Sequence, residues 1–553
     1  MILIFWLLGL VQATAPYETK AWHKLIHYEK TFLGVESEVD GPGFFLAADG
    51  KTNPQGEFQA TIKALNDTRA LYGHLKQPAA CVFVARKIWL ESLGYQFPKV
   101  DCPDYETWRK GLPVKQVSVV FASAYPNNPA SMFGHTFLRL RGSGEGSDLL
   151  DYVVNFAATA NQDGGLEFAL FGVFGGYEGH FSLAPYFIKI NEYNHVEARD
   201  LWEYPLVISS QAIDRLLAHL WEIESTSYFD YYFFDENCSY QLMRLLEAAD
   251  PELDFELPFY VLPAQTIHSL AQKEMLQSPI YRASLKRQYE ALSDIDQKRL
   301  MLLRIKERKG ELKSDEQAEY HQRLQQMAKE KKNVGEIDVA PGMNRPDRGH
   351  HFSRVGMGYV EKDKFWVSHR FVLHDLLDHD QGHESWSQLQ VLALKLEHDE
   401  RIFLRELTLI DVISLHRSHD FSYEPSWLLN LGLATPKEFS CNRCVTLKTE
   451  LGIGQSFFFK NESFFVSGFA IGRFYGHSPS EHSHWLGGGL RVNLGFRYEQ
   501  FKFVAEKTKL WSAMPNAKDD VNIQLNYAIG EQVALRALVA EKQDYELSLN
   551  FYY

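Results

Sequence analysis

The chain has 553 residues, which is too many for a single ordinary core, so two or more domains are expected. Hydrophobic residues make up 45% of it, a fraction typical of a folded protein rather than a disordered one. The net charge of -14 argues against a nucleic-acid-binding protein, because neutralising phosphates requires a basic surface.

The N-terminus predicts a secretory signal peptide over residues 1–13. Residues 2–11 are apolar apart from one glycine, and Val11 and Ala13 hold the small-residue positions before a cleavage after Ala13. A buried N-terminal helix is the alternative, because the positively charged start of a signal peptide is missing. No later run of 18 apolar residues occurs, so we expect no transmembrane helix. Export would carry the chain to an oxidising compartment.

The next two regions differ in their apolar spacing. Residues 17–112 carry apolar side chains three and four residues apart, which predicts a helical N-terminal region. Residues 113–260 predict a second domain, which mixes strands and helices. Its expected strands are "VKQVSVVFASAYP", "HTFLRLRG", "LLDYVVNFAA" and the long stretch 186–209.

Residues 261–345 predict a charged helical connector. The part from 282 to 332 is rich in Lys and Arg and forms helices readily, although the protein as a whole is acidic. We interpret it as a solvated connector. Contact with anionic lipid head groups is the alternative.

Residues 350–553 predict an outer-membrane β-barrel. Twelve short segments, from "SRVGMGYVE" to "YELSLNFYY", often alternate apolar with polar residues and are joined by turn residues. Aromatic residues gather near the segment ends, and the chain ends in "NFYY". An even number of about twelve strands is expected. A soluble β-sandwich is the alternative.

The five cysteines leave one unpaired. Cys81 and Cys102 lie close in sequence, and Cys441 and Cys444 form a CxxC that could pair or bind metal. Cys238 then has no partner. An odd cysteine in an exported protein indicates a possible reactive thiol.

Cys238 stands in "FFDENCSYQLM", where a helix is expected to begin. The positive end of the helix dipole lowers a thiol pKa and favours the thiolate. A cysteine nucleophile needs a base, and His135 in "FGHTFLRL" is the best candidate because it opens a strand. Asn155 or Asp151 on the next strand could orient its ring, and we prefer Asn155. Inert packing is the alternative for the cysteine.

Several motifs together carry a resemblance to a known family. "ENCSYQL", "FGHTFLRL", "DYVVNF", "FGGYEG" and "RDLWEY", with a C-terminal barrel, resemble the bacterial Lnb N-terminal periplasmic domain family over about residues 110–255. That family is similar to circularly permuted papain-like enzymes, including lecithin:retinol acyltransferases and NlpC-type peptidases. The resemblance implies an α+β permuted papain-like domain in which the His-bearing strand precedes the Cys-bearing helix.

The resemblance also implies acyl transfer through a thioester. Cys238 would attack a phospholipid acyl donor, His135 would take its proton, and the acyl group would pass to the amine of a lipoprotein or peptide acceptor. Backbone N–H groups at the helix start would hold the oxyanion. The rivals are a cysteine peptidase or amidase acting on peptidoglycan or peptides, and a non-enzymatic transport or assembly barrel.

Two histidine-containing stretches could bind metal. "HDLLDHDQGHE" spans residues 374–384, and "SEHSHW" spans 480–485. We interpret the first as a strand-end turn with solvated charges and the second as a polar loop. No metal or cofactor is therefore expected.

Overall fold

The computed structural model divides the chain into two compact units, residues 1–285 and 286–553. The expected signal peptide, Cys441 and most of the "SEHSHW" loop lie outside the described residues. The structure describes the chain except residues 1–13, 125–131, 143–149, 160–171, 173–174, 198, 234, 257–259, 291, 293, 331–344, 361–363, 417–424, 437–443, 460–461, 477–484, 512–519 and 541–544.

The first unit begins with short helices and two small hairpins. Proline stands in the first turn of α2 and α5, where its fixed φ suits a helix start. The elements are η1 (Pro16–Glu18), α1 (Lys20–Leu25), β1 (Tyr28–Thr31), β2 (Gly34–Ser37), α2 (Pro54–Asn66), β3 (Leu71–Tyr72), β4 (Gln77–Pro78), α3 (Ala79–Val82), α4 (Val84–Ser92) and α5 (Pro103–Lys110).

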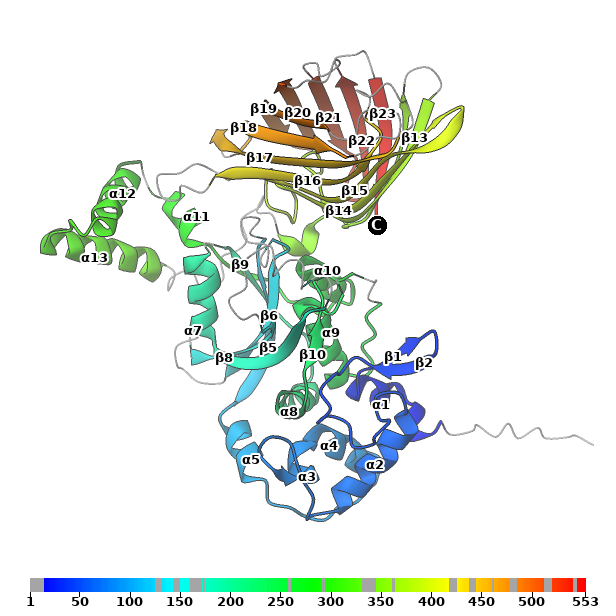
Figure 1. Ribbon diagram of the computed structural model, residues 1–553. Coiled ribbons are helices and arrows are strands. Elements are labelled where there is room, and N and C mark those ends of the chain that lie inside the picture. The colour runs from blue at the N-terminus through cyan, green and yellow to red at the C-terminus, as the bar shows by residue number, and fades with distance from the viewer. Residues whose placement is uncertain are drawn as a thin grey trace, which may run out of the picture. The chain divides into compact units, whose positions relative to one another are not determined.

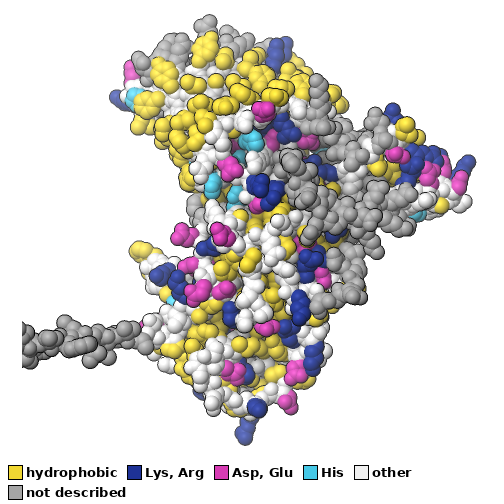
Figure 2. All heavy atoms as spheres, turned by 180° about the vertical axis from the view of Figure 1, so that it is seen from behind, with side chains coloured by type: hydrophobic (Ala, Val, Ile, Leu, Met, Phe, Trp, Pro, Cys, Tyr) yellow, Lys and Arg dark blue, Asp and Glu magenta, His cyan; other side chains and the backbone are white. Residues whose placement is uncertain are grey.

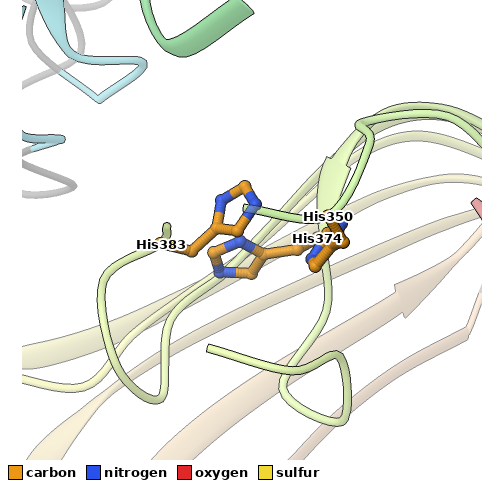
Figure 3. Close-up of side chains that lie close together, drawn as sticks. All are labelled: His350, His374 and His383. Atoms are coloured by element: carbon orange, nitrogen blue, oxygen red, sulfur yellow. The ribbon is translucent and has the colours of Figure 1, made fainter. Parts of the chain in front are cut away.

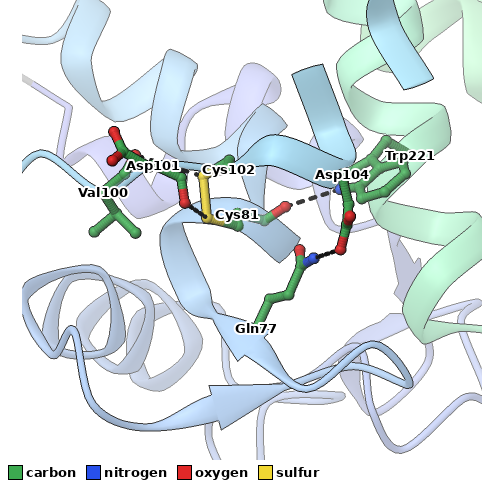
Figure 4. The surroundings of a disulfide bond; sticks show 7 residues. All are labelled: Gln77, Cys81, Val100, Asp101, Cys102, Asp104 and Trp221. Carbon is green, nitrogen blue, oxygen red and sulfur yellow. Dashed lines mark hydrogen bonds between the residues drawn. A yellow bond between two sulfur atoms is a disulfide. The ribbon is translucent and has the colours of Figure 1, made fainter. Parts of the chain in front are cut away.

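A disulfide between Cys81 and Cys102 ties α3 to the start of α5, with the two Cα atoms 5.2 Å apart (Figure 4). The Trp221 indole N–H donates to the Cys81 carbonyl at 2.8 Å. The expected pairing of these two cysteines is therefore confirmed. Cys444 is also disulfide-bonded.

A seven-stranded antiparallel sheet forms the core of the first unit (Figure 1). Helices α8, α9 and α10 contact its strands. In spatial order the strands are β10 (Phe229–Tyr231), β8 (Tyr177–Pro185), β7 (Tyr152–Ala158), β6 (His135–Gly142), β5 (Val114–Ala122), β9 (Leu201–Pro205) and β11 (Ile280–Arg282). The helices are α8 (Ser210–Thr226), α9 (Cys238–Ala249) and α10 (Pro263–Gln272).

One expected strand is a helix. Residues 186–196 form α7 (Tyr186–Lys189) and a π-helix, η3 (Ile190–Val196), so only Leu201–Pro205 of the stretch 186–209 is a strand. Tyr186, Ile190 and Tyr193 recur at helical spacing and pack against the sheet. The expectation of a strand here was wrong because interleaved polar residues imitate a two-residue period.

The second unit begins with α11 (Leu285–Glu290), α12 (Asp294–Arg308) and α13 (Ser314–Glu330). Ion pairs join α12 to α13, including Arg323 with Asp296 at 2.8 Å. Among the helices that the structure describes, none is both long and apolar enough to cross a membrane.

Twelve antiparallel strands then close into a barrel, in which β12 pairs with β23. The expected number of twelve strands is confirmed. They are β12 (Arg354–Val360), β13 (Lys364–His374), β14 (Gln388–Asp399), β15 (Arg401–Ser414), β16 (Ser426–Ala434), β17 (Thr446–Phe459), β18 (Phe464–Tyr475), β19 (Trp485–Tyr498), β20 (Phe501–Trp511), β21 (Asp520–Ala528), β22 (Val533–Ala540) and β23 (Tyr545–Tyr552).

The barrel wall is apolar outside and polar inside. On β19, the Val492 side chain is 46% exposed, whereas its neighbour Arg491 is 9% exposed. Figure 2 shows hydrophobic side chains gathered over the barrel. Alternation of this kind is the pattern of a membrane-spanning barrel with a polar interior.

The loop between β13 and β14, residues 375–387, packs against the inner wall. Leu376, Leu377 and Trp386 are buried with Phe465 and Phe469 of β18. The Trp386 indole N–H also donates to the Glu462 carbonyl at 2.7 Å. The expectation of a solvated turn was wrong, because apolar and charged side chains of this loop find partners inside the barrel.

Buried ion pairs fix the same loop. Asp375 pairs with Arg536 at 2.7 Å, and Asp380 pairs with Lys502 at 2.6 Å. Asp378 pairs with Arg370 of β13. Buried carboxylates are tolerated only when they are paired in this way.

Candidate active site

Cys238 is the first residue of α9 and is only 4% exposed. The preceding Asn237 caps the helix: its Oδ1 accepts from the N–H groups of Ser239 at 3.0 Å and Tyr240 at 3.3 Å. Its Nδ2 donates to the carbonyls of Phe233 at 2.9 Å and Val261 at 2.6 Å. Both polar atoms of its side chain are bonded, so Asn237 fixes where the helix begins and where the Cys238 thiol stands.

His135 is the first residue of β6, and it pairs with Ala122 of β5. Gly134 before it has a φ of +88°, and a Cβ there would lie 2.7 Å from the Phe121 ring. Only glycine fits that position without strain. The Tyr193 ring lies 5.3 Å from the imidazole. The strand and this ring together hold the imidazole in place.

Asn155 of β7 contacts the imidazole. Its Oδ1 lies 2.8 Å from His135 Nε2. An amide oxygen only accepts, so Nε2 donates and Nδ1 is left as the basic nitrogen. Asp151, the other expected orienting residue, instead accepts from Arg139 at 2.6 Å. The structure thus brings Asn155 to His135 and directs Asp151 elsewhere.

The Cys238 thiol has a pKa lowered to about 7. Burial alone would raise this pKa. The opposing effects are larger in sum: the charge of His135, a hydrogen bond from His135, the backbone N–H of Thr136 and the Ser239 hydroxyl. His135 therefore lies close enough to the thiol to act on it, and its effect favours the thiolate.

The sequence analysis missed three residues that contribute to the site: Thr136, Ser239 and Tyr231. Thr136 supplies a backbone N–H to the thiolate, and its hydroxyl lies 3.1 Å from that of Ser239. Burial raises the pKa of Tyr231, and the charge of Cys238 raises it further, so this phenol lies near the sulfur. Thr136 and Ser239 directly follow His135 and Cys238, so their positions could have indicated them.

Metal ligands are not gathered at this site. Across the described part of the chain, one group of three His, Cys, Asp or Glu residues is close enough to hold an ion, and it lies in the barrel unit. Cys238 is the free cysteine that the structure describes. Its surroundings suit nucleophilic chemistry.

Residues 104–273 match the model of the Lnb N-terminal periplasmic domain. The resemblance expected from the sequence is thereby confirmed, and the match includes Cys238, His135 and Asn155. Residues 16–93 and 343–552 match two domains of unknown function, DUF7843 and DUF7840. No curated protein matches the chain. The permuted papain-like fold stays a prediction.

Porins are among the solved structures similar to the barrel. The KdgM porin in complex with disordered oligogalacturonate is 11% identical, with 36% of this chain and 98% of that chain covered and a TM-score of 0.23. The NanC porin is 6% identical over 36% and 98%, with a TM-score of 0.24. Omp33 of Acinetobacter baumannii is 12% identical over 37% and 99%, with a TM-score of 0.20.

The closed barrel, with its apolar outer face, and the matched periplasmic domain locate the protein. It is an outer-membrane protein with a barrel of twelve strands and a periplasmic domain. The expected localisation is therefore confirmed.

Proposed function

We propose that the protein is a cysteine-dependent acyltransferase that moves an acyl group from a phospholipid to an amine through a thioester on Cys238. The observation that carries the proposal is the geometry of the site: Cys238 opens α9, and Asn155 orients His135 at 2.8 Å. His135 lowers the pKa of the thiol against the effect of burial. A thiolate at neutral pH is the nucleophile that such a reaction needs.

In the first step, the Cys238 sulfur attacks the ester carbonyl of the phospholipid. The S–C bond forms and the ester C–O bond breaks, leaving an acyl-thioester and a lysophospholipid alkoxide. His135 holds the thiol proton and gives it to that alkoxide. Asn155 keeps the imidazole in the required tautomer through its hydrogen bond of 2.8 Å.

The oxyanion of this step needs backbone donors. The N–H groups of Ser239 and Tyr240 are already bonded to Asn237. We therefore assign the role to the N–H of Cys238 itself, which stands at the positive end of α9.

In the second step, an amine attacks the thioester carbonyl. The N–C bond forms, the C–S bond breaks, and the amine proton passes through His135 to the thiolate. The N-terminal amine of a lipoprotein is the acceptor that we propose. Water in place of the amine would make the same site a hydrolase of lipids, peptidoglycan or peptides.

The test incubates the purified full-length protein in detergent with a diacyl phospholipid and follows the Cys238 peptide by mass spectrometry. We expect an acyl adduct that hydroxylamine removes and that an added lipopeptide amine discharges as an amide. Cys238→Ala should carry no adduct, and His135→Ala should form it about 100-fold more slowly or worse. Asn155→Ala should fall between His135→Ala and the wild type.

His180→Ala is the matched control, because His180 is a partly exposed histidine on β8 of the same sheet. It should form the adduct at the wild-type rate. If the protein cleaves a peptidoglycan peptide and never forms the acyl adduct, it is a peptidase and not an acyltransferase. Equal adduct in the wild type and Cys238→Ala would remove Cys238 from the reaction.

A further inference from the structure

Three histidines from separate segments meet at one end of the barrel (Figure 3). His350 precedes β12, His374 ends β13, and His383 belongs to the loop of residues 375–387. One ring nitrogen from each lies within 4.8 Å of the other two. Neither the family matches nor the proposed acyl transfer gives this cluster a role.

The hydrogen bonds of His350 fix where its lone pair points. Its Nδ1 lies 2.7 Å from the His351 carbonyl oxygen, which only accepts, so Nδ1 carries the proton. The other nitrogen, Nε2, is then a lone-pair donor. It is buried and has no hydrogen-bond partner among the residues that the structure describes.

His374 presents a second ligand atom in the same manner. Its Nε2 lies 2.8 Å from the Ser387 hydroxyl, and its Nδ1 is buried with no hydrogen-bond partner in the described part of the chain. Both His350 and His374 are more than nine-tenths buried. A buried polar atom without a partner is costly, so two such atoms in one cluster call for a shared partner.

We propose that His350, His374 and His383 form a zinc site that fastens the loop of residues 375–387 to the barrel wall. Three imidazole nitrogens are a common zinc ligand set, and a fourth position stays available to water. A cavity of about 490 Å³, lined by His350 and Tyr552 among others, adjoins the cluster and gives solvent a route to it.

The site needs only a small closure. Tetrahedral ligands at about 2.0 Å from zinc lie about 3.3 Å apart, so nitrogens within 4.8 Å must approach by roughly 1.5 Å. The side chain of His383 can supply this movement, because it is half-buried. Its ring already stacks on that of His350, with the centroids 4.3 Å apart.

The ring nitrogens of His350 and His374 that would not bind zinc are hydrogen-bonded, as they are in other histidines that bind zinc. Each ligand imidazole of a metal site usually donates its other N–H to a carbonyl or a similar acceptor. Here the His351 carbonyl and the Ser387 hydroxyl are those acceptors. Ser387 belongs to the same loop. The metal would therefore connect three segments: the chain before β12 through His350, the end of β13 through His374, and the loop through His383.

The test measures zinc in the full-length protein, purified in detergent without reductant and dialysed against zinc-containing buffer and then metal-free buffer. We expect one zinc per chain in the wild type and none in His374→Ala or His383→Ala. Ser387→Ala should weaken zinc binding about 10- to 100-fold. His321→Ala, an exposed histidine on α13 of the same unit, should keep one zinc.

Two further measurements separate loss of zinc from loss of folding and report the coordination geometry. A heat-modifiable gel shift shows whether each variant is folded. Cobalt titration of the wild type should give the visible bands of a tetrahedral site, and those bands should be absent from the variants. A folded wild type without stoichiometric zinc, or His374→Ala and His383→Ala that keep it, would overturn the proposal.

Discussion

The Nε2 atom of His135 lies 2.8 Å from the Oδ1 atom of Asn155, on the neighbouring strand. Because the amide oxygen can only accept, this contact assigns the ring proton to Nε2 and leaves Nδ1 free to act as a base. One hydrogen bond between two strands thus sets the tautomer of the residue that we propose as the general base for Cys238.

The first prediction concerns the pH dependence of alkylation at Cys238. The thiolate reacts and the thiol does not, so the rate with iodoacetamide should rise with pH and reach half its maximum near pH 7. In His135→Ala the effect of burial is less opposed, so the midpoint should move upward. His180→Ala should keep the wild-type midpoint. A midpoint in the wild type at the ordinary thiol value near 8.5 would contradict the account.

The second prediction concerns the cap of α9. Asn237→Ala removes four hydrogen bonds and leaves the carbonyls of Phe233 and Val261 without that partner. We expect a cost of about 3 kcal/mol, seen as roughly 100-fold faster hydrogen exchange in the first turns of α9. Asn66→Ala, at the exposed end of α2, is the control and should leave α9 unchanged. Unchanged hydrogen exchange in Asn237→Ala would show that Asn237 does not stabilise the start of α9.

The third prediction concerns the disulfide of the first unit. Cys81 and Cys102 are 21 residues apart, and closing a loop of that length stabilises a fold by about 3 kcal/mol. Reductant should therefore lower the urea midpoint of the periplasmic unit in the full-length protein. It should have no effect on the double variant Cys81→Ser with Cys102→Ser. If reductant lowers the urea midpoint equally in the wild type and the double variant, the Cys81–Cys102 disulfide is not the cause.

The fourth prediction concerns the outer face of the barrel. Val492 is exposed near the middle of β19, so Val492→Arg would put a charge into lipid at a cost of about 2–4 kcal/mol. The folded fraction in lipid vesicles, read from the heat-modifiable gel shift, should fall. Leu33→Arg is the matched control, because Leu33 is exposed in the turn between β1 and β2. If both variants fold equally well, Val492 does not face lipid.

Patterns that repeat were predictable from the sequence, and contacts between distant segments were less so. The twelve barrel segments were found because lipid outside and water inside impose a two-residue period on every strand. Asn155 and Asp151 could both be named because both lie on the strand expected beside His135. Asn155 was preferred because a cysteine site in an exported protein can use an uncharged residue to orient the histidine.

The π-helix carrying Tyr193 was missed, because its aromatic residues also fit a strand. The loop of residues 375–387 was misread for a different reason. Its aspartates look solvated until Arg536 and Lys502, more than a hundred residues later, are brought to them by barrel closure. Local sequence carries no signal of such a partner.

The most direct test of the central claim is mass spectrometry of the Cys238 peptide after incubation of the full-length protein with a diacyl phospholipid. The account predicts a hydroxylamine-sensitive acyl adduct on Cys238 that disappears when a lipopeptide amine is added, with the amide product appearing in equal amount. A folded protein whose Cys238 stays unmodified throughout, while transfer to the amine proceeds, would contradict it.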